Sequence, residues 1–297
     1  MRRSRHSHPN GTGWCAAISA AAVLYSHSPA GAEPANGHHR PDHDTTVYAG
    51  TALVSRYVAR GIVFADGASF QPWVEFDVPV LKARFGDSLA PRLRFGNWNS
   101  VNLGDSDTGR PQGGLEENLR HWYETDVYAG VSLSLTERMS GTLTYFVYSS
   151  PSDSFSTSTD LEARINYADA DFWPWRGFAL NPALRVTREL RRPTGSGRWY
   201  YQPSLTPSLT FGNRPYTLQV PLVAGFSPDD WYVDAQGSTI SRGFFQTGLS
   251  LGIPFEAWSI AWNANAAVDA YLPDSDAQNG FDDNLELVWR IGLSTAF

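Results

Sequence analysis

Residues 285–297, which end the chain, alternate between apolar and polar side chains almost without interruption. The apolar parity contains Leu285, Leu287, Trp289, Ile291, Leu293, Thr295 and Phe297. The other parity contains Glu286, Arg290, Gly292 and Ser294. A two-residue period places alternate side chains on opposite faces of a β-strand. The chain is therefore predicted to end in a strand with one apolar face, one polar face and an aromatic last residue.

The tail Arg290-x-Gly292-x-x-Thr295-x-Phe297 resembles the C-terminal signal that the barrel-assembly machinery reads in bacterial outer-membrane β-barrels. The resemblance implies that Gly292, Thr295 and Phe297 form an assembly signal and that this machinery is a partner. Thr295 stands where the pattern has an apolar residue. The last strand of a water-soluble sandwich would alternate in the same way, so the tail alone leaves both architectures open.

The opposite end of the chain has the features of a secretory signal peptide. Arg2, Arg3 and Arg5 precede an uncharged stretch over 14–25, and Ala30-Gly31-Ala32 follows as a small-x-small cleavage site. The stretch is too short to cross a bilayer as a helix. We expect residues 1–32 to be removed on export. The one cysteine of the sequence, Cys15, lies inside this leader, so the mature chain has no disulfide and no thiolate metal ligand.

Charge argues against a nucleic-acid partner. The full chain has 23 basic and 30 acidic side chains, and the leader takes three arginines and no acid with it. Residues 33–45 are polar and include His38, His39 and His43, which favours a disordered periplasmic lead-in, with metal binding by the histidines as the alternative. We expect the protein to need no cofactor.

The mature chain contains no apolar run of the ~20 residues that a membrane helix needs. Only a closed barrel could then satisfy every backbone donor and acceptor in lipid. Residues 46–297 are accordingly predicted to form an all-β, transmembrane, antiparallel up-and-down barrel in the bacterial outer membrane, with lipids and lipopolysaccharide as partners. About twelve alternating segments support this fold. They are 46–57, 69–79, 91–101, 121–135, 139–149, 158–168, 178–188, 198–211, 215–225, 241–253, 257–271 and 285–297.

Connections between these segments alternate in length, as in an up-and-down barrel. Short turns are predicted at 80–90, 136–138, 212–214 and 254–256, and long loops at 58–68, 102–120, 150–157, 189–197, 226–240 and 272–283. The connection 169–177 is long but carries Phe172, Trp173 and Trp175, which suit an interfacial aromatic girdle. A second girdle is predicted at the outer strand ends, from aromatic residues that include Trp98, Tyr148, Tyr200, Trp231 and Tyr232.

The polar faces of these segments carry charges of both signs, too many for a dry core. The predicted lumen residues are Arg56, Arg60, Glu75, Asp77, Arg92, Arg94, Glu124, Asp126, Glu162, Arg164, Arg185, Asp269, Glu286 and Arg290. Two interpretations stay open. Rows of opposite charge face each other across a pore and filter solutes, or the same side chains pair and fill the barrel as a plug.

A motif near the start of the barrel resembles a known family. Ser55-x-Tyr57-x-x-Arg60-Gly61, followed by Gly67, Gln71 and Pro72, resembles the opening hairpin of the TorF-like porin family. The resemblance implies an outer-membrane location and a barrel fold. It implies no catalytic residue.

The function that these features favour is passive diffusion of small polar solutes or ions through an outer-membrane channel. A closed structural or adhesive barrel that acts through its loops is an alternative. A lipid-modifying enzyme is less favoured, because His121 is the one histidine of the predicted barrel and no serine has a nucleophile context. The acidic loops lack the ligand spacing of an EF-hand, which favours solvated charge over a calcium site.

Overall fold

The structure, a computed structural model, describes residues 45–80, 91–104, 121–191, 197–212, 215–277, 280–281 and 284–297. The predicted signal peptide over 1–32 and all but the last residue of the lead-in over 33–45 lie outside the described residues. So do most of the predicted loop 102–120 and nearly all of the predicted turn 80–90.

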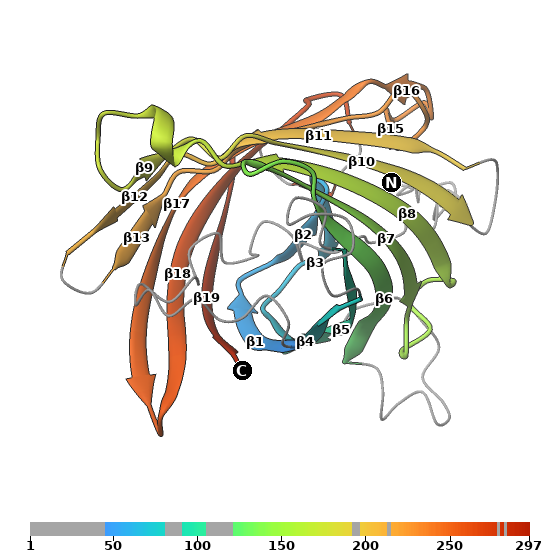
Figure 1. Cartoon of the computed structure of the whole chain (residues 1–297). Coiled ribbons are helices and arrows are strands. Elements are labelled where there is room, and N and C mark those ends of the chain that lie inside the picture. The colour runs from blue at the N-terminus through green and yellow to red at the C-terminus, as the bar shows by residue number, and fades with distance from the viewer. Residues whose placement is uncertain are drawn as a thin grey trace, which may run out of the picture.

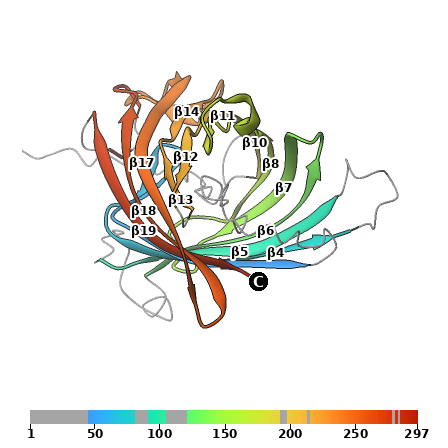
Figure 2. The same cartoon turned by 60° about the vertical axis from the view of Figure 1, so that its left-hand side comes forward.

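Twelve antiparallel strands of the described chain form a closed barrel, which confirms the predicted fold class (Figure 1). The wall consists of β1 (Thr46–Val54), β4 (Ser69–Pro79), β5 (Arg92–Asn102), β6 (Trp122–Ser134), β7 (Met139–Ser149), β8 (Ser158–Tyr167), β10 (Ala183–Arg191), β11 (Trp199–Leu205), β14 (Leu222–Phe226), β17 (Arg242–Ala257), β18 (Ile260–Pro273) and β19 (Glu286–Ala296). In the turned view, β4 to β7 form one side of the ring and β17 to β19 the other, with the C-terminus where the two sides meet (Figure 2).

The first and last wall strands close the ring. β1 pairs with β19 from Tyr48 opposite Ala296 to Val54 opposite Arg290. Beyond this ladder, the amide of Phe297 donates to the carbonyl of Val47 at 2.9 Å, and the amide of Val47 donates to the carbonyl of Phe297 at 3.2 Å. Both ends of the wall thus lie at one rim, which we call the turn end because the short turns also lie there. The opposite rim is the loop end, and in up-and-down outer-membrane barrels the long loops generally lie outside the cell.

Side chains alternate across the wall with the polarity that lipid requires. On the outer face, Val127, Leu287 and Ile291 are 57–59% exposed, whereas Glu124 and Asp126 inside the barrel are fully buried. A water-soluble barrel would have the reverse arrangement, since exposed apolar surface is costly in water. The outer rows therefore face hydrocarbon and the charged rows face the lumen. Thr295, the polar exception at the tail, donates its hydroxyl to the carbonyl of Ala261 at 2.8 Å and so presents no unsatisfied group to lipid.

Three predicted strands are each interrupted near a proline. Pro182 separates β10 from β9 (Phe178–Ala179), Pro207 separates β11 from β12 (Ser208–Phe211), and Pro221 separates β14 from β13 (Tyr216–Gln219). Proline has no amide hydrogen to donate to a ladder, and the three interruptions lie on neighbouring strands. Figure 1 shows β9, β12 and β13 running away from the break on the side opposite to β10 and β11. The wall therefore bends here.

A short connection holds this bend together at the turn end. It includes the 3-10 helix η3 (Ala170–Phe172). The buried carboxylate of Asp169 accepts hydrogen bonds from the amides of Leu180 and Asn181, at 3.0 and 2.9 Å, and from the indole of Trp173 at 2.9 Å. The side-chain amide of Asn181 then donates to the carbonyl of Thr206 at 3.0 Å. Asp169 thus supplies acceptors to backbone amides that the broken ladder leaves without a strand partner.

Two predicted boundaries were wrong. The turn expected at 254–256 lies instead at Trp258 and Ser259, whose φ angles of 53° and 61° are those of a tight two-residue hairpin. Pro254 lies within β17 beyond Gly252, the last β17 residue paired with β13, where an unpaired strand edge tolerates proline. The first strand ends at Val54 rather than at residue 57. The predicted loop that follows forms a separate hairpin of β2 (Tyr57–Ala59) and β3 (Ile62–Ala65).

We expect Asp169→Ala to lower the free energy of unfolding by about 2 kcal/mol, because it removes hydrogen bonds between a carboxylate and two backbone amides. Asp169→Asn keeps one acceptor and should lose less. Burial by itself raises the pKa of Asp169, but hydrogen bonds from Asn181, Trp173 and Leu180 bring it below 3.8.

A carboxyl group with a lowered pKa stabilises the fold above its unfolded-state pKa, and that contribution is lost as the pH falls through the folded-state pKa. The advantage of the native chain over Asp169→Asn should thus be complete near neutral pH and vanish in strong acid. Denaturant titration in lipid vesicles at pH 7 and at about pH 2 compares the native chain with Asp169→Asn at both limits. Equal stability of Asp169→Ala and the native chain at pH 7 would contradict the assignment.

Candidate functional site

The candidate site is the interior of the barrel, where charged side chains of neighbouring strands form ion pairs. Arg92 Nε lies 2.8 Å from Asp77 Oδ1, and Arg94 Nη2 lies 2.5 Å from Glu75 Oε1, both between β4 and β5. Further along the wall, Arg290 Nη1 lies 3.5 Å from Asp269 Oδ2 between β19 and β18. These pairs lie along the wall rather than across the lumen, and each partner shields the charge of the other.

The β2–β3 hairpin fills the lumen at the loop end. We call residues 57–65 the inner hairpin. Figure 1 shows it inside the ring of wall strands. Its two strands pair with each other and form a sheet separate from that of the wall. Tyr57, Val58, Ala59, Arg60 and Ile62 are all buried. The segment predicted as an external loop is therefore a plug, because its apolar side chains find their burial inside the barrel.

The tip of the inner hairpin reaches the far wall. Arg60 and Gly61 form the turn with φ angles of 50° and 70°. Arg60 Nη2 lies 2.8 Å from Asp160 Oδ2 and 3.9 Å from Glu162 Oε2, both on β8. A side chain at Gly61 would overlap the ring of Phe244. Arg60 was predicted to line the lumen. The structure places it inside the lumen at the end of the plug, where a buried ion pair fixes it.

Aromatic residues enclose the Arg60 guanidinium. Its Cζ atom lies 4.7 Å from the ring centre of Trp231 and 5.2 Å from that of Tyr200. A second guanidinium, that of Arg198, also contacts the ring of Trp231, with its Cζ atom 4.6 Å from the ring centre. Arg198 Nε in turn lies 2.6 Å from Glu189 Oε2. Such cation–π contacts gain strength when the cation is shielded from water. Trp231 therefore links the inner hairpin to the loop that precedes β15 (Tyr232–Val233) and β16 (Thr239–Ile240).

The base of the inner hairpin is fixed on the near side of the lumen. The hydroxyl of Tyr57 donates to Glu124 Oε2 at 2.8 Å, and its ring packs 5.4 Å from that of Trp98. Arg56 pairs with Asp66 and with Glu286, whose Oε2 lies 3.0 Å from Arg56 Nη1. Glu124 and Asp126, predicted to line the lumen, are fully buried beneath this contact.

The aromatic girdle predicted at the loop end is largely wrong. Trp98, Tyr148, Tyr200, Trp231 and Tyr232 are at most 3% exposed and face the interior, whereas Trp122 and Trp199 are on the outer face, 38% and 40% exposed. Alternation cannot distinguish an aromatic ring that anchors in lipid from one that packs on a plug. The sequence reasoning also missed Asp160 and Glu189, although they share the parity of the predicted residues Glu162 and Arg185.

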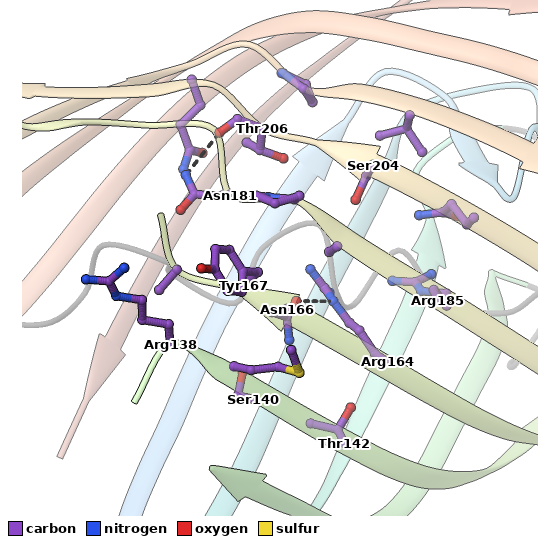
Figure 3. Close-up of a pocket in the computed structure, with 18 of the residues that line it drawn as sticks. Arg138, Ser140, Thr142, Arg164, Asn166, Tyr167, Asn181, Arg185, Ser204 and Thr206 are labelled. Atoms are coloured by element: carbon purple, nitrogen blue, oxygen red, sulfur yellow. Dashed lines mark hydrogen bonds between the residues drawn. The ribbon is translucent and has the colours of Figure 1, made fainter. Parts of the chain in front are cut away.

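Below the plug, the lumen widens into a cavity of about 470 Å³, which we call the vestibule (Figure 3). It extends from the turn residues Thr136 to Met139 inward to Asp269 and Arg290. Uncharged polar side chains make up much of its wall. Representative examples are Ser140, Thr142, Asn166, Gln202, Ser204 and Thr206. Predicted lumen residues Arg94, Arg164 and Arg185 also line it, and Figure 3 shows Arg164 and Arg185 on adjacent strands.

The described residues contain no cluster that could hold a metal ion, and His121 lies at the loop end. Within the described residues, no group of three His, Cys, Asp or Glu side chains could hold a metal ion. His121 lies just before β6 at the loop end, and its carbonyl accepts hydrogen bonds from the amides of Asn102 and Tyr123 at 2.7 and 3.0 Å. The acidic loop residues 105, 107, 116, 117, 282 and 283 lie outside the described residues.

No family model matches the sequence, and no curated protein matches it. Solved structures with a similar form include an outer membrane channel from Pseudomonas putida F1, at 10% identity and a TM-score of 0.49 over 85% of this chain and 94% of that one. A bacterial polysaccharide outer membrane secretin matches at 9% identity and 0.45, over 86% and 98%. The NanC porin matches at 10% identity and 0.43, over 85% and 99%.

The location of the protein follows from its own residues. Among the described residues, no helix has both the length and the apolar character needed to cross a membrane. The closed wall satisfies its backbone groups internally, and its apolar rows face outward around a charged lumen. These features make the protein a transmembrane β-barrel of the bacterial outer membrane.

The buried pair of Arg60 and Asp160 should be strongly coupled. We expect Arg60→Ala to cost about 3 kcal/mol of unfolding free energy, because it leaves Asp160 buried without its cation. Asp160→Ala should cost a similar amount, and the double variant less than the sum. A coupling energy of about 2 kcal/mol is expected from a double-mutant cycle in lipid vesicles.

The matched control is the exposed pair of Arg242 and Asp274, whose Nη2 and Oδ2 atoms lie 2.9 Å apart at the loop end. Since exposed ion pairs contribute little, its coupling should stay below about 1 kcal/mol. Equal coupling in the two cycles would show that the inner hairpin is not held by Arg60.

Proposed function

We propose that the protein is an outer-membrane channel for small polar solutes and ions, and that the inner hairpin closes it at the loop end. The observation that carries this proposal is the polar vestibule, which fills the turn-end half of the lumen and ends beneath a plug made from a loop. A purely structural barrel has no need of a cavity of about 470 Å³ lined by charged and amide side chains.

The construction of the plug supports a movable gate. The inner hairpin forms its own two-stranded sheet, so it can leave the lumen without breaking the backbone ladder of the wall. Its attachment depends on side chains: the Arg60–Asp160 pair, the Tyr57–Glu124 hydrogen bond and the hydroxyl of Tyr232, which donates to the carbonyl of Arg60 at 2.8 Å. Such contacts can break and re-form while the barrel remains intact.

We infer that the chain belongs with the TorF-like porins. Four of the residues that carry this resemblance, Ser55, Tyr57, Arg60 and Gly61, have a role in the plug. Ser55 pairs with Trp289 through backbone and hydroxyl contacts of 3.0 and 3.1 Å, which fix the start of the loop. Tyr57 fixes the base of the hairpin through Glu124, and Arg60 fixes its tip through Asp160. Gly61 allows the backbone to approach the ring of Phe244 closely.

A closed barrel that acts through its loops is the second candidate, because the plug occupies the loop end in this structure. The two candidates differ in one measurable property. A gated channel conducts once the plug is loosened, whereas a structural barrel stays closed in every folded variant.

We expect the native protein in planar bilayers to give small or infrequent current steps, and Arg60→Ala to give larger and longer ones. Removing the Arg60 guanidinium removes the contact between the plug and the far wall. Gly61→Val should act in the same direction, since valine disfavours a φ of 70° and would overlap Phe244.

Arg242→Ala, which removes an exposed charge at the loop end, serves as the control and should conduct like the native chain. Heat-modifiable gel mobility establishes that each variant is folded. Silent bilayers from folded Arg60→Ala and Gly61→Val would eliminate the channel and favour the structural barrel.

A further inference from the structure

Two arginines lie side by side on the wall of the vestibule. Arg164 on β8 is directly opposite Arg185 on β10 in the strand register, and both side chains line the cavity (Figure 3). Cross-strand neighbours have Cβ atoms about 5 Å apart, and like charges placed in this way destabilise a sheet. Arg164 Nε donates to Asn166 Oδ1 at 2.7 Å, and an anion bound between the two guanidinium groups would offset their repulsion.

Glu162 is a carboxylate beside this pair of arginines. Glu162 Oε1 lies 3.5 Å from Arg185 Nε, but the second oxygen of Glu162 also faces Arg60 at 3.9 Å and accepts a hydrogen bond from Thr187. One carboxylate is thus shared between two guanidinium groups. Among the described residues of the cavity wall, five arginines accompany two carboxylates, and the ion-pair partners Glu75, Glu162 and Asp171 lie outside this lining.

Two arginines of the cavity wall have donors that could bind an anionic ligand. The Nε atoms of Arg185 and Arg290 are buried and make no hydrogen bond, and both residues line the vestibule. Carboxylates lie 3.5 Å from both guanidinium groups, and a bound acceptor would complete the hydrogen bonding of these two buried donors. Guanidinium groups bind carboxylate and phosphate oxygens especially well, because their planar donors match the two oxygens of such a group.

The rest of the lining suits a small polar ligand. Hydroxyls of Thr142 and Ser204 and amides of Asn166 and Gln202 can donate to or accept from a solute. The cavity volume of about 470 Å³ lies within the range of small-molecule sites. A charged solute drawn to the arginines could therefore be held by uncharged neighbours.

We propose that Arg164 and Arg185 form a binding site for a small oxyanion, a carboxylate or a phosphate, so that the channel selects anionic solutes. This inference rests on the proposed function for the route of the solute, whereas the site itself exists whether or not the plug opens. Arg164 and Arg185 bind the anionic group, and Arg290 faces the same cavity from the opposite part of the ring.

The test is direct binding to the purified full-length protein in detergent, measured by isothermal titration calorimetry. Three probes are used at equal ionic strength: succinate, inorganic phosphate and succinamide, the uncharged isostere of succinate. We expect the native protein to bind one or both anions and not succinamide. Succinate alone would identify a carboxylate site, and phosphate alone a phosphate site.

We expect Arg164→Gln with Arg185→Gln to weaken anion binding by about tenfold or more, since two charge-assisted contacts are lost. If this variant does not fold, Arg164→Lys with Arg185→Lys keeps both charges and loses the planar fork, and should weaken binding to a smaller degree. Arg242→Gln at the loop end is the matched control and should bind like the native chain.

Anion binding that the double variants leave unchanged would overturn the proposal, as would equal binding of succinamide, or no binding of either anion. Its failure is distinguishable from failure of the proposed function. Folded variants with a loosened plug that stay silent in bilayers remove the channel but leave a site that binds succinate or phosphate. Current steps without anion binding remove the site but leave the channel.

Discussion

Closure of the wall is the constraint on which the remaining structure depends. A backbone amide or carbonyl that faces hydrocarbon has no water to bind, so each must find a partner in the wall itself. The pairing of β1 with β19 meets this demand between the two ends of the chain. Where prolines interrupt three neighbouring strands, the carboxylate of Asp169 and the side chain of Asn181 take over part of the hydrogen bonding. Side chains thus replace a ladder that the backbone cannot complete.

A closed wall with an apolar exterior places most charges of its strands inside, so these charges must find partners in the lumen. Toward the turn end, Arg92 and Arg94 pair with acids on the next strand. The loop-end half of the lumen is sealed by the inner hairpin, and Glu124, Asp126 and Asp160 are fully buried there. Buried charges are tolerated only when paired, so the plug needs Arg60 and the acids need the plug. This mutual dependence links the gate of the proposed channel to the stability of its wall.

Alternation predicted all twelve wall strands of the described chain, because an element with two faces in two different media has a period of two in its sequence. The many charges on the polar faces, rather than the alternation, indicated that those faces point into the lumen. The sequence also placed Glu75, Arg94, Arg185 and Arg290 on the inner face. It could not separate wall residues from plug residues. The positions of Tyr57 and Arg60 in the sequence fit both a continuing strand and a hairpin that turns inward. The sequence around Trp231 likewise fits both a tryptophan at the membrane interface and one that packs against the plug.

The sequence by itself determined that this chain forms an all-β barrel with apolar rows outside and charged rows inside, since those rows repeat along each strand and are local. Tertiary structure alone decided which charges meet. Arg60 lies 100 residues before Asp160, and Arg164 meets Arg185 only through the register of β8 and β10. Contacts of this kind depend on the direction that a loop takes and on the stagger of paired strands. Neither leaves a periodic trace in the order of the residues.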